Sequence, residues 1–267
     1  MKAFDYHKPK SVPEAAALLA KASESRVLGG GMSLLPAMKQ RLAAPEALID
    51  LSGIAALKGV AMNDGAITIG AMTRHVDVAT SPVVTKALPA VSQLAGGIGD
   101  PAVRNRGTIG GSLANNDPAA DYPAAVLALG ATIVTNAREI PGEQFFRGMF
   151  ETALAPGELI TAVKFPLPTA AGYAKLQNAA SRFALVGVFV AKFPTGVRVA
   201  VTGAGPVVFR TPAIESALGK RFEPSAVNGH GVDVAGLNSD IHAEAAFRAH
   251  LITVMAKRAV EAALGSV

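Results

Sequence analysis

Two glycine-rich segments are the first candidates for chemistry in this chain. Residues 26–38 read RVLGGGMSLLPAM, with three successive glycines between an apolar run and a helical pattern. Residues 108–125 read TIGGSLANNDPAADYPAA, with a glycine pair ahead of another helical pattern. Because glycine lacks Cβ, backbone N–H groups there can converge on phosphate oxygens, and the helix that follows adds a favourable dipole. Either segment alone could be an ordinary chain reversal. Both together favour a ligand held from two sides, such as the pyrophosphate of a dinucleotide.

Other chemical motifs fail at defining positions. The glycines at 29–31 do not form GxGxxG, because Leu34 occupies the last position. Residues 219–221 read GKR without a preceding P-loop, and the residues around Ser33 do not complete GxSxG. The five histidines show no clustered spacing. We therefore predict no metal site in this chain.

The composition restricts the chemistry further. The chain has no cysteine, which excludes disulfides, thiolate nucleophiles and cysteine-ligated iron–sulfur clusters, so redox chemistry would need an organic cofactor. A net charge of +5 without dense basic runs, and the absence of Trp, argue against nucleic-acid binding. No apolar run approaches the roughly 20 residues of a transmembrane helix, and the N-terminus does not read as a signal peptide. The expected location is the cytoplasm, with association with the inner face of the membrane through a complex left open.

The elements that must position the glycine segments follow from hydrophobic periodicity and from Gly and Pro signals. Ser11 and Glu14 predict a capping box at the start of a helix, and Ser33 is a candidate cap for a second helix. Strands are predicted at 26–30, 47–51, 66–71, 131–135, 158–165, 172–180, 183–193 and 196–205; further helices are predicted at 34–42, 118–129 (closed by Gly130) and 241–264.

The length of 267 residues predicts about two domains. Pro166 and Pro168 interrupt the pattern, so we place a boundary after residue 166. Residues 1–166 alternate strands and helices and divide into subdomains at about 1–55 and 56–166. Residues 167–267 predict a smaller domain with three antiparallel strands and a covering helix. The fold class is therefore α+β.

Five segments together resemble a known family. FDYHKPKSVPEAAALLAK, LGGGMSLLPAMKQRL, RNRGTIGGSLANNDPAADYPA, PGELITAVKFP and GYAKLQNAASRFALVGV follow one another in the family's order and spacing. The chain resembles the FAD-binding medium subunits of molybdenum hydroxylases, the carbon monoxide dehydrogenase and xanthine dehydrogenase family, from Phe4 to about Leu264. The resemblance implies a two-subdomain FAD-binding domain of the PCMH type, followed by a smaller C-terminal α+β domain.

The resemblance also implies which residues hold the cofactor. Asp121 would hydrogen-bond polar groups of FAD, and Lys175 would lie near the flavin edge, where a cation could stabilise the reduced flavin. Ile98 and Ile160 would pack against the cofactor. The two implied phosphate loops are Val27, Leu28, Gly29, Gly30, Gly31, Met32, Ser33 and Leu34 in the first, and Thr108, Ile109, Gly110, Gly111 and Ser112 in the second. Met32 stands where relatives often carry a polar residue, and Asn178 stands where a basic residue is common. No catalytic side chain is implied, because the flavin performs the redox step.

The implied function is electron transfer within a complex. A large molybdenum–pterin subunit would oxidise the substrate and a small [2Fe–2S] subunit would relay electrons to this chain's FAD, with the assembly a dimer of heterotrimers. FAD would be non-covalent, and this chain would not oxidise substrate alone. Two alternatives stay open: a stand-alone FAD reductase of the UDP-N-acetylenolpyruvylglucosamine reductase type, and a non-redox dinucleotide-binding scaffold. Neither the substrate nor the electron acceptor is implied.

Overall fold

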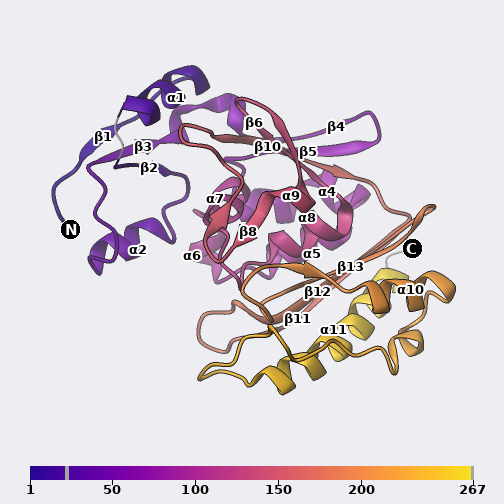
Figure 1. Cartoon of the computed structure of the whole chain (residues 1–267). Helices are drawn as coiled ribbons and strands as arrows, with labels where there is room; N and C mark the ends of the chain where they lie inside the picture. The colour runs from indigo at the N-terminus through magenta and orange to yellow at the C-terminus, as the bar shows by residue number, and fades with distance from the viewer. Residues whose placement is uncertain (22–23, 266–267) are drawn as a thin grey trace.

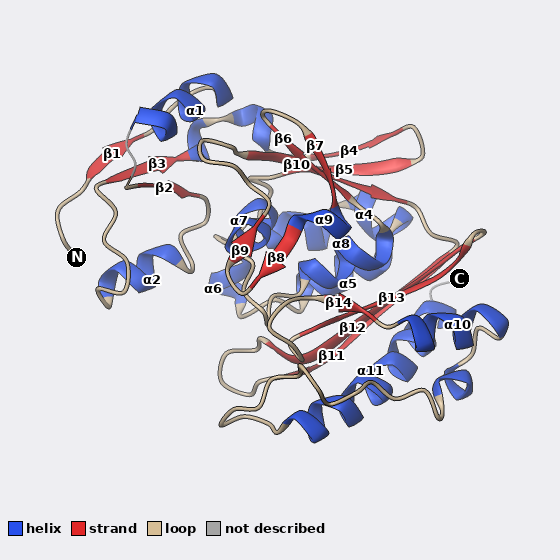
Figure 2. Cartoon of the chain, viewed as in Figure 1, coloured by secondary structure: helices blue, strands red, loops and turns tan. Residues whose placement is uncertain are grey.

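The computed structural model describes residues 1–21 and 24–265, which form three consecutive units (Figures 1 and 2). The first unit contains β1 (Asp5–His7), α1 (Val12–Lys21), β2 (Ser25–Leu28), α2 (Leu34–Lys39) and β3 (Ala47–Asp50). The second contains β4 (Val60–Asn63), β5 (Ala66–Gly70), α3 (His75–Thr80), α4 (Pro82–Ala87), α5 (Pro89–Gly96), α6 (Pro101–Arg104), α7 (Ile109–Asn115), α8 (Tyr122–Leu129), β6 (Thr132–Thr135), β7 (Glu139–Pro141), α9 (Gly142–Phe145), β8 (Phe146–Gly148), β9 (Glu151–Thr152) and β10 (Ile160–Pro166). The third contains β11 (Ala170–Gln177), β12 (Ala184–Phe193), β13 (Gly196–Thr202), β14 (Phe209–Arg210), α10 (Pro212–Lys220) and α11 (Ala245–Gly265). The predicted boundary at residue 166 falls between β10 and β11. None of the described helices is both long and apolar enough to cross a membrane.

The first unit is a small parallel sheet with the strand order β1-β3-β2. All four residues of the central strand β3 are buried, as expected for a strand covered on both sides. Parallel neighbours need crossover connections, which α1 and α2 supply. The first glycine segment begins where β2 ends at Leu28, beside Asp50 of β3. It therefore lies at the carboxyl edge of a parallel sheet, where ligands bind in many α/β folds.

The second unit is an antiparallel sheet with the order β4-β5-β10-β6-β7. Its inward-facing residues, such as Ile67 and Ile69 on β5 and Val163 and Phe165 on β10, are buried with the helices of this unit in one core. Alternation along β5, where every second residue is buried, explains why the sequence predicted this strand correctly.

Helix α8 joins the second and third units. All eight of its residues, Tyr122–Leu129, are buried, because a helix that is apolar on every side must be covered all round. It packs against β12 and β13 of the third sheet and against α5 and β10 of its own unit, and Figure 1 shows it between the two sheets. Gly130 ends the helix in the left-handed conformation, with φ of 62°. This confirms Gly130 as the predicted end of the helix.

The third unit is an antiparallel sheet with the order β11-β12-β13-β14. Its strands and the long helix α11 share a core of Val, Ile and Ala side chains. A Cβ at Gly172 of β11 would lie 2.0 Å from the carbonyl oxygen of Ala259. The backbone of α11 therefore lies directly on β11, and only glycine permits that approach. The two-residue strand β14 adds a fourth strand to the three that were predicted.

The region between residues 108 and 129 differs from the sequence expectation. The second glycine segment is the first turn of a helix, α7, and the next helix starts at Tyr122 instead of residue 118. Asn116 ends α7 in the left-handed conformation, and the side chain of Asp117 accepts a hydrogen bond from the N–H of Ala119 at 2.9 Å. Such a local side-chain contact competes with helix formation, which explains why residues 117–121 stay outside α8.

The two predicted helix caps have different outcomes. The N–H of Glu14 donates to Ser11 Oγ at 3.3 Å, and the Glu14 carboxylate accepts from the N–H of Lys10 at 2.8 Å, so the cap at α1 is confirmed. Ser33 adopts helical angles and makes no side-chain capping bond. The predicted Ser33 cap is therefore wrong, since capping requires an extended backbone at that position. The predicted helix 241–264 is confirmed as α11, with its start at Ala245.

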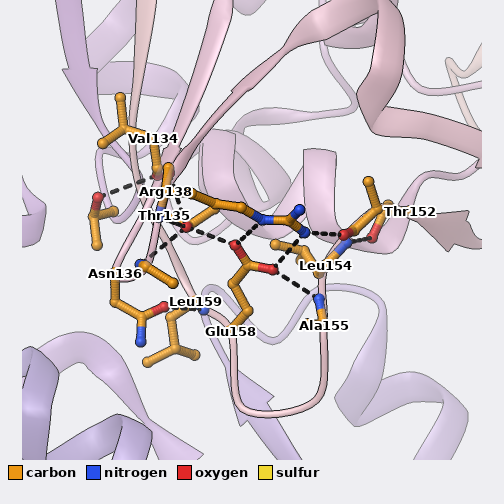
Figure 3. A network of polar contacts seen from close by, with 12 residues as sticks. Val134, Thr135, Asn136, Arg138, Thr152, Leu154, Ala155, Glu158 and Leu159 are labelled. Carbon is orange, nitrogen blue, oxygen red and sulfur yellow. Dashed lines mark hydrogen bonds and ion pairs between the residues drawn. The ribbon is translucent and has the colours of Figure 1, made fainter.

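A buried carboxylate ties the turn between β6 and β7 to the loop before β10 (Figure 3). Glu158 accepts hydrogen bonds from Thr135 Oγ1 at 2.7 Å, from Arg138 Nε and Nη2 at 3.0 Å each, and from the N–H of Ala155 at 2.8 Å. The bonds from Arg138 and the other donors outweigh desolvation and lower the pKa of Glu158 to about 2 from 4.5. All of these bonds favour the charged form.

Replacing Glu158 by Gln is expected to lower the free energy of unfolding at pH 7 by about 1–2 kcal/mol, less than the full pKa shift implies, because Arg138 is half exposed. Because the folded pKa is below the unfolded value, this stability is complete above about pH 4.5 and is lost as the pH falls toward 2. Urea denaturation of wild type and variant at pH 7 and pH 3 measures the difference, which should shrink at pH 3. Glu139→Gln is the matched control, because its pair with Lys164 is exposed on both sides. An equal effect of the two substitutions would contradict the assignment.

Candidate cofactor-binding site

The two glycine segments meet in space. A Cβ at Gly30 would lie 2.0 Å from the carbonyl oxygen of Arg106 and 2.6 Å from the Cα of Gly107. A Cβ at Gly29 would lie 3.1 Å from Thr108 Oγ1. Backbone of the first segment therefore rests directly on Arg106 and Gly107, the two residues that lead into the second segment, at distances that exclude any side chain at Gly30. The two predicted loops therefore lie side by side.

The second segment and Gly107 before it are hydrogen-bonded through their backbone to the residues that follow β5. The N–H of Gly110 donates to the carbonyl oxygen of Ala71 at 2.8 Å, and the N–H of Ile109 donates to that of Thr73 at 3.1 Å. The N–H of His75 donates to the carbonyl oxygen of Gly107 at 2.9 Å. Residues 71–75 thus fix the second segment through its backbone. The sequence analysis missed this support, because a backbone contact carries no residue-type signal.

The residues of the second segment divide into a buried and an accessible group. Thr108, Ile109 and Gly110 are buried, whereas Gly111 is exposed and Ser112 is half-buried. A Cβ at Gly110 would lie 2.6 Å from Ala71 Cβ, and its N–H already has a partner. The structure therefore gives Gly110 a packing role against Ala71, and its contact with the cofactor stays a prediction. Thr108 Oγ1 accepts from the N–H of Gly111 at 3.1 Å and caps α7.

The first segment runs from the sheet to the surface. Val27 and Leu28 at the end of β2 and Leu34 at the start of α2 are half-buried, the three glycines between them are half-buried, and Met32 and Ser33 are exposed. Among the described residues, the N–H groups of Gly30, Gly31, Met32 and Ser33 donate to no protein acceptor. Unpaired backbone donors in a glycine-rich turn form a concavity suited to an anion.

Asp121 and Lys175 form a buried ion pair where α8 meets β11. Lys175 Nζ lies 2.8 Å from Asp121 Oδ1, and it also donates to the carbonyl oxygens of Gly97 and Arg182 at 2.9 Å each. The hydroxyl of Tyr173 donates to the same Asp121 oxygen at 2.6 Å. Burial raises the pKa of the Asp121 carboxyl, and Lys175 and Tyr173 oppose that rise. Asp121 is only 3% exposed, so its observed partners are this lysine and this tyrosine.

The two isoleucines predicted to pack against a cofactor belong to the main core. Ile160 opens β10 and is 6% exposed, and Ile98 is half-buried against the same core. Ile98 directly follows Gly97, whose carbonyl oxygen binds Lys175. The side-chain oxygen of Asn178 accepts hydrogen bonds from the N–H groups of Ala180 and Ser181. It therefore shapes the turn between β11 and β12.

No group of three or more His, Asp or Glu side chains within residues 1–21 and 24–265 could hold a metal ion. A recess of about 310 Å³ lies between the 117–119 turn, the 149–150 turn and residues 178–185, and the glycines of the two segments do not line it. Its lining mixes exposed apolar side chains with polar groups.

Comparison with known proteins places this geometry in a family. Residues 2–168 match the family described as the FAD binding domain in molybdopterin dehydrogenase. This chain belongs to that family. The resemblance predicted from the sequence is thereby confirmed, and with it FAD as the cofactor and the α+β fold class.

Similar proteins cover the chain almost end to end. The carbon monoxide dehydrogenase medium chain of Hydrogenophaga pseudoflava is 36% identical, over 97% of this chain and 96% of the relative. The nicotine 6-hydroxylase medium subunit of Paenarthrobacter nicotinovorans is 34% identical, over 97% of this chain and 96% of the relative. These likenesses extend well beyond residue 168 and include the third unit.

Solved structures agree with the sequence relatives. Carbon monoxide dehydrogenase from Hydrogenophaga pseudoflava, in a form that lacks the Mo-pyranopterin moiety of its cofactor, matches with a TM-score of 0.88 at 36% identity, over 99% of this chain and 98% of that one. Quinoline 2-oxidoreductase from Pseudomonas putida 86 matches with a TM-score of 0.90 at 30% identity, over 100% of this chain and 99% of that one. The chain is a flavoprotein subunit of the oxidoreductase class, and the medium-chain type implies large and small partner subunits. The individual FAD-binding residues remain predictions.

The residues present fit a dinucleotide. The first segment offers unpaired N–H groups, and the exposed Gly111 lies within 3.8 Å of the Cβ position of Gly29. A hydrogen bond from such a group to a charged oxygen contributes about 1.5–3 kcal/mol. Glycines without Cβ leave the approach open for a phosphate.

Replacing Gly30 by Ala is expected to reduce flavin retention at least tenfold, because the added Cβ would collide with the Arg106 carbonyl and push the two segments apart. Flavin content per chain after gel filtration measures the effect. Gly219→Ala is the matched control: nothing lies within 4 Å of the added Cβ, and alanine in α10 should stabilise the fold by about 0.5–1 kcal/mol. Wild-type flavin content in Gly30→Ala would show that the observed junction is not part of the binding site.

Proposed function

We propose that this chain is the FAD-carrying medium subunit of a molybdenum hydroxylase, which takes electrons from a [2Fe–2S] subunit and passes them to an external acceptor. The observation that carries the proposal is the meeting of the two glycine segments, in a chain that matches medium chains over 97% of its length. Bound FAD supplies the redox chemistry. The residues of this chain bind it, orient it and shape its surroundings.

The pyrophosphate of FAD is assigned to the junction of the two segments. The free N–H groups of residues 30–33 would bind the pyrophosphate from the first segment. Gly111 and Ser112, whose N–H groups already donate to Thr108, would line it from the second segment. The exposed thioether of Met32 offers no hydrogen-bond donor, so this position contributes through its backbone. Such a site recognises charge and shape through backbone donors.

Lys175 is assigned to the flavin edge, and its ion pair with Asp121 fixes the position of the lysine amine. Three oxygens fix the lysine amine, on Asp121, Gly97 and Arg182. Because the amine is held on three sides, its charge keeps one position beside the cofactor. Fixed charges in a site of low dielectric act strongly on a redox group. Asp121 therefore acts on the cofactor through Lys175 in this proposal.

Substrate recognition is assigned to another subunit. Medium chains of 31–36% identity to this one carry the names of complexes acting on carbon monoxide, nicotine and glyceraldehyde. One conserved scaffold accompanies chemically unrelated substrates, which supports a substrate site outside this chain. The electron acceptor is left unassigned by the same reasoning.

We expect FAD to bind non-covalently and far more tightly than FMN. The site has two phosphate-directed segments, which suit a pyrophosphate, and it has neither a cysteine nor a histidine in the first segment for covalent attachment. Acid precipitation of the purified chain should release yellow FAD into the supernatant, identified by chromatography. Flavin that stays with the precipitate, or an extract that contains FMN alone, would contradict this.

A rigid apolar turn supports docking of a partner subunit. Met149 and Phe150 are 53% and 59% exposed, and Phe150 has a φ of 57°, which is strained for a bulky side chain. The buried Asn116 amide holds this turn by donating to the carbonyl oxygens of Gly148 and Glu151 at 2.7 and 2.8 Å. The fold thus tolerates strain in order to present two apolar side chains to solvent, as protein interfaces do. We assign this turn to contact with a subunit of the complex, within a dimer of heterotrimers.

The paired substitution Met149→Ser and Phe150→Ser is expected to reduce co-purification with the small and large subunits at least tenfold while flavin stays bound. The subunits are co-expressed, the complex is captured through a tag on the large subunit, and the medium chain is quantified. Leu42→Ser is the matched control, because Leu42 is 79% exposed and follows α2 in the first unit. Capture of the paired variant at the wild-type level would show that the subunit interface does not include this turn.

The same preparations test the alternative enzyme class. The medium chain without partners should show no oxidation of an organic substrate, and the complex should show it. Turnover by the isolated chain at ordinary enzyme rates would favour the stand-alone reductase.

A further inference from the structure

His75 lies buried beneath the second glycine segment. It opens α3, is 4% exposed, and its N–H donates to the carbonyl oxygen of Gly107. A Cβ at Gly107 would lie 2.6 Å from His75 Nε2 and 2.8 Å from Cδ2. The Nε2–Cδ2 edge of the imidazole therefore lies against Gly107 and fills the space that this glycine leaves open.

The contact continues from Gly107 to the first segment. Gly107 Cα lies 2.6 Å from the Cβ position of Gly30. The imidazole, Gly107 and Gly30 thus form three successive layers, without a side chain between the two glycines. Closely packed layers transmit displacement, so a shift of the ring moves the junction that forms the proposed phosphate site.

The ring has no partner for a second proton. His75 Nδ1 is buried without a hydrogen-bond partner among the described residues, and so is the hydroxyl of Tyr122, whose ring centroid lies 5.4 Å away. The neighbouring elements offer no free counter-ion. Asp77 on α3 is paired with Arg74, and Asp121 before α8 is paired with Lys175. Lys86 on α4 and Arg104 on α6 are cations, and α5 carries no charged residue.

We propose that His75 is a positioning residue for the cofactor: its neutral ring holds Gly107 against Gly30, and proton uptake by the ring opens the junction and releases FAD. The proposal rests on FAD binding at this site and adds a residue and a pH dependence to it.

The direction of the pH dependence follows from the surroundings. Burial, followed by the charge of Arg104, lowers the pKa of His75 to about 4 from 6.5. An opened junction exposes the ring and restores its ordinary pKa, so protons favour the open form. FAD affinity therefore falls as the pH drops below about 6.5, by up to roughly 150-fold at pH 4, the ratio set by the two pKa values.

The test uses the full-length chain loaded with FAD. Released flavin is followed by its fluorescence from pH 8 to pH 4, and circular dichroism follows the fold in the same samples. His75→Gln removes the titrating group and keeps a polar side chain of similar size. It should bind FAD within about threefold of wild type at pH 7, because a neutral side chain still fills the site, and lack the acid loss of affinity. His75→Ala should weaken binding at pH 7 at least tenfold. His250→Gln, at an exposed position of α11, is the matched control and should behave as wild type.

The outcomes separate this inference from the proposed function. A chain that binds no FAD at any pH would overturn both. Tight binding of FAD at pH 7 with the same acid profile in wild type and His75→Gln would overturn the role of His75 alone, and so would normal binding by His75→Ala. If His75→Gln does not fold, nitrogen NMR of the imidazole in the wild-type chain decides. The ring should titrate at lower pH with FAD bound than after FAD is removed, and identical titration would overturn the proposal.

Discussion

The structure depends on one contact between two stretches of bare backbone. Gly30 rests on Arg106 and Gly107 at distances that no side chain would allow. The first segment comes from a parallel three-stranded sheet and the second from a helix start in a different unit, so this contact also joins the two subdomains. Its contribution is mostly geometric: the first segment keeps backbone N–H groups that have no acceptor among the described residues. A phosphate that accepts those hydrogen bonds satisfies donors that would otherwise need water.

The rest of the chain keeps that junction in place through two kinds of contact. The apolar helix α8 fills the space between the second and third sheets and fixes their separation by close packing. Polar contacts at the N-terminal end of α8 then fix its position along the strands of the third sheet. Thr202 Oγ1 donates to the carbonyl oxygen of Ala120 at 2.6 Å, and the Asp121–Lys175 pair connects the helix start to β11. Burying a charged pair is costly unless every partner is present, and here the lysine has three oxygens. The third unit is thus tied to the second unit by specific contacts as well as by packing.

The sequence predicted the elements whose pattern is local. Strand β5 alternates buried and exposed residues, and Gly130 stops α8 through its own conformation, so both could be read from the chain. Helix α7 could not, because Gly110 and Gly111 have low helix propensity and the helix exists through the contact with Ala71 and the Thr108 cap. The cofactor assignments show the same limit. Composition and spacing indicated both glycine segments, yet only the structure distinguishes Gly110, which packs inward, from Gly111, which is exposed. The resemblance pointed to both Asp121 and Lys175 as cofactor residues. Their ion pair could not be predicted, because the two residues lie 54 positions apart and no local pattern links them.

A site built from backbone explains how one scaffold can accompany different substrates. Backbone N–H groups are present whatever side chain the position carries, so Met32 can replace a polar residue without removing the donor beneath it. Side chains around the junction are then free to vary, provided that they leave the glycine contact and its support intact. The buried residues that pack against Gly107 and Gly110 cannot vary in the same way, because closely packed layers accept few changes in volume. We therefore expect tolerance of substitution at this site to differ from that at most ligand sites, where the residues that touch the ligand tolerate the fewest changes. Exposed residues of the first segment are tolerant, and buried residues without any contact to the ligand, such as those behind Gly107 and Gly110, are the restrictive ones.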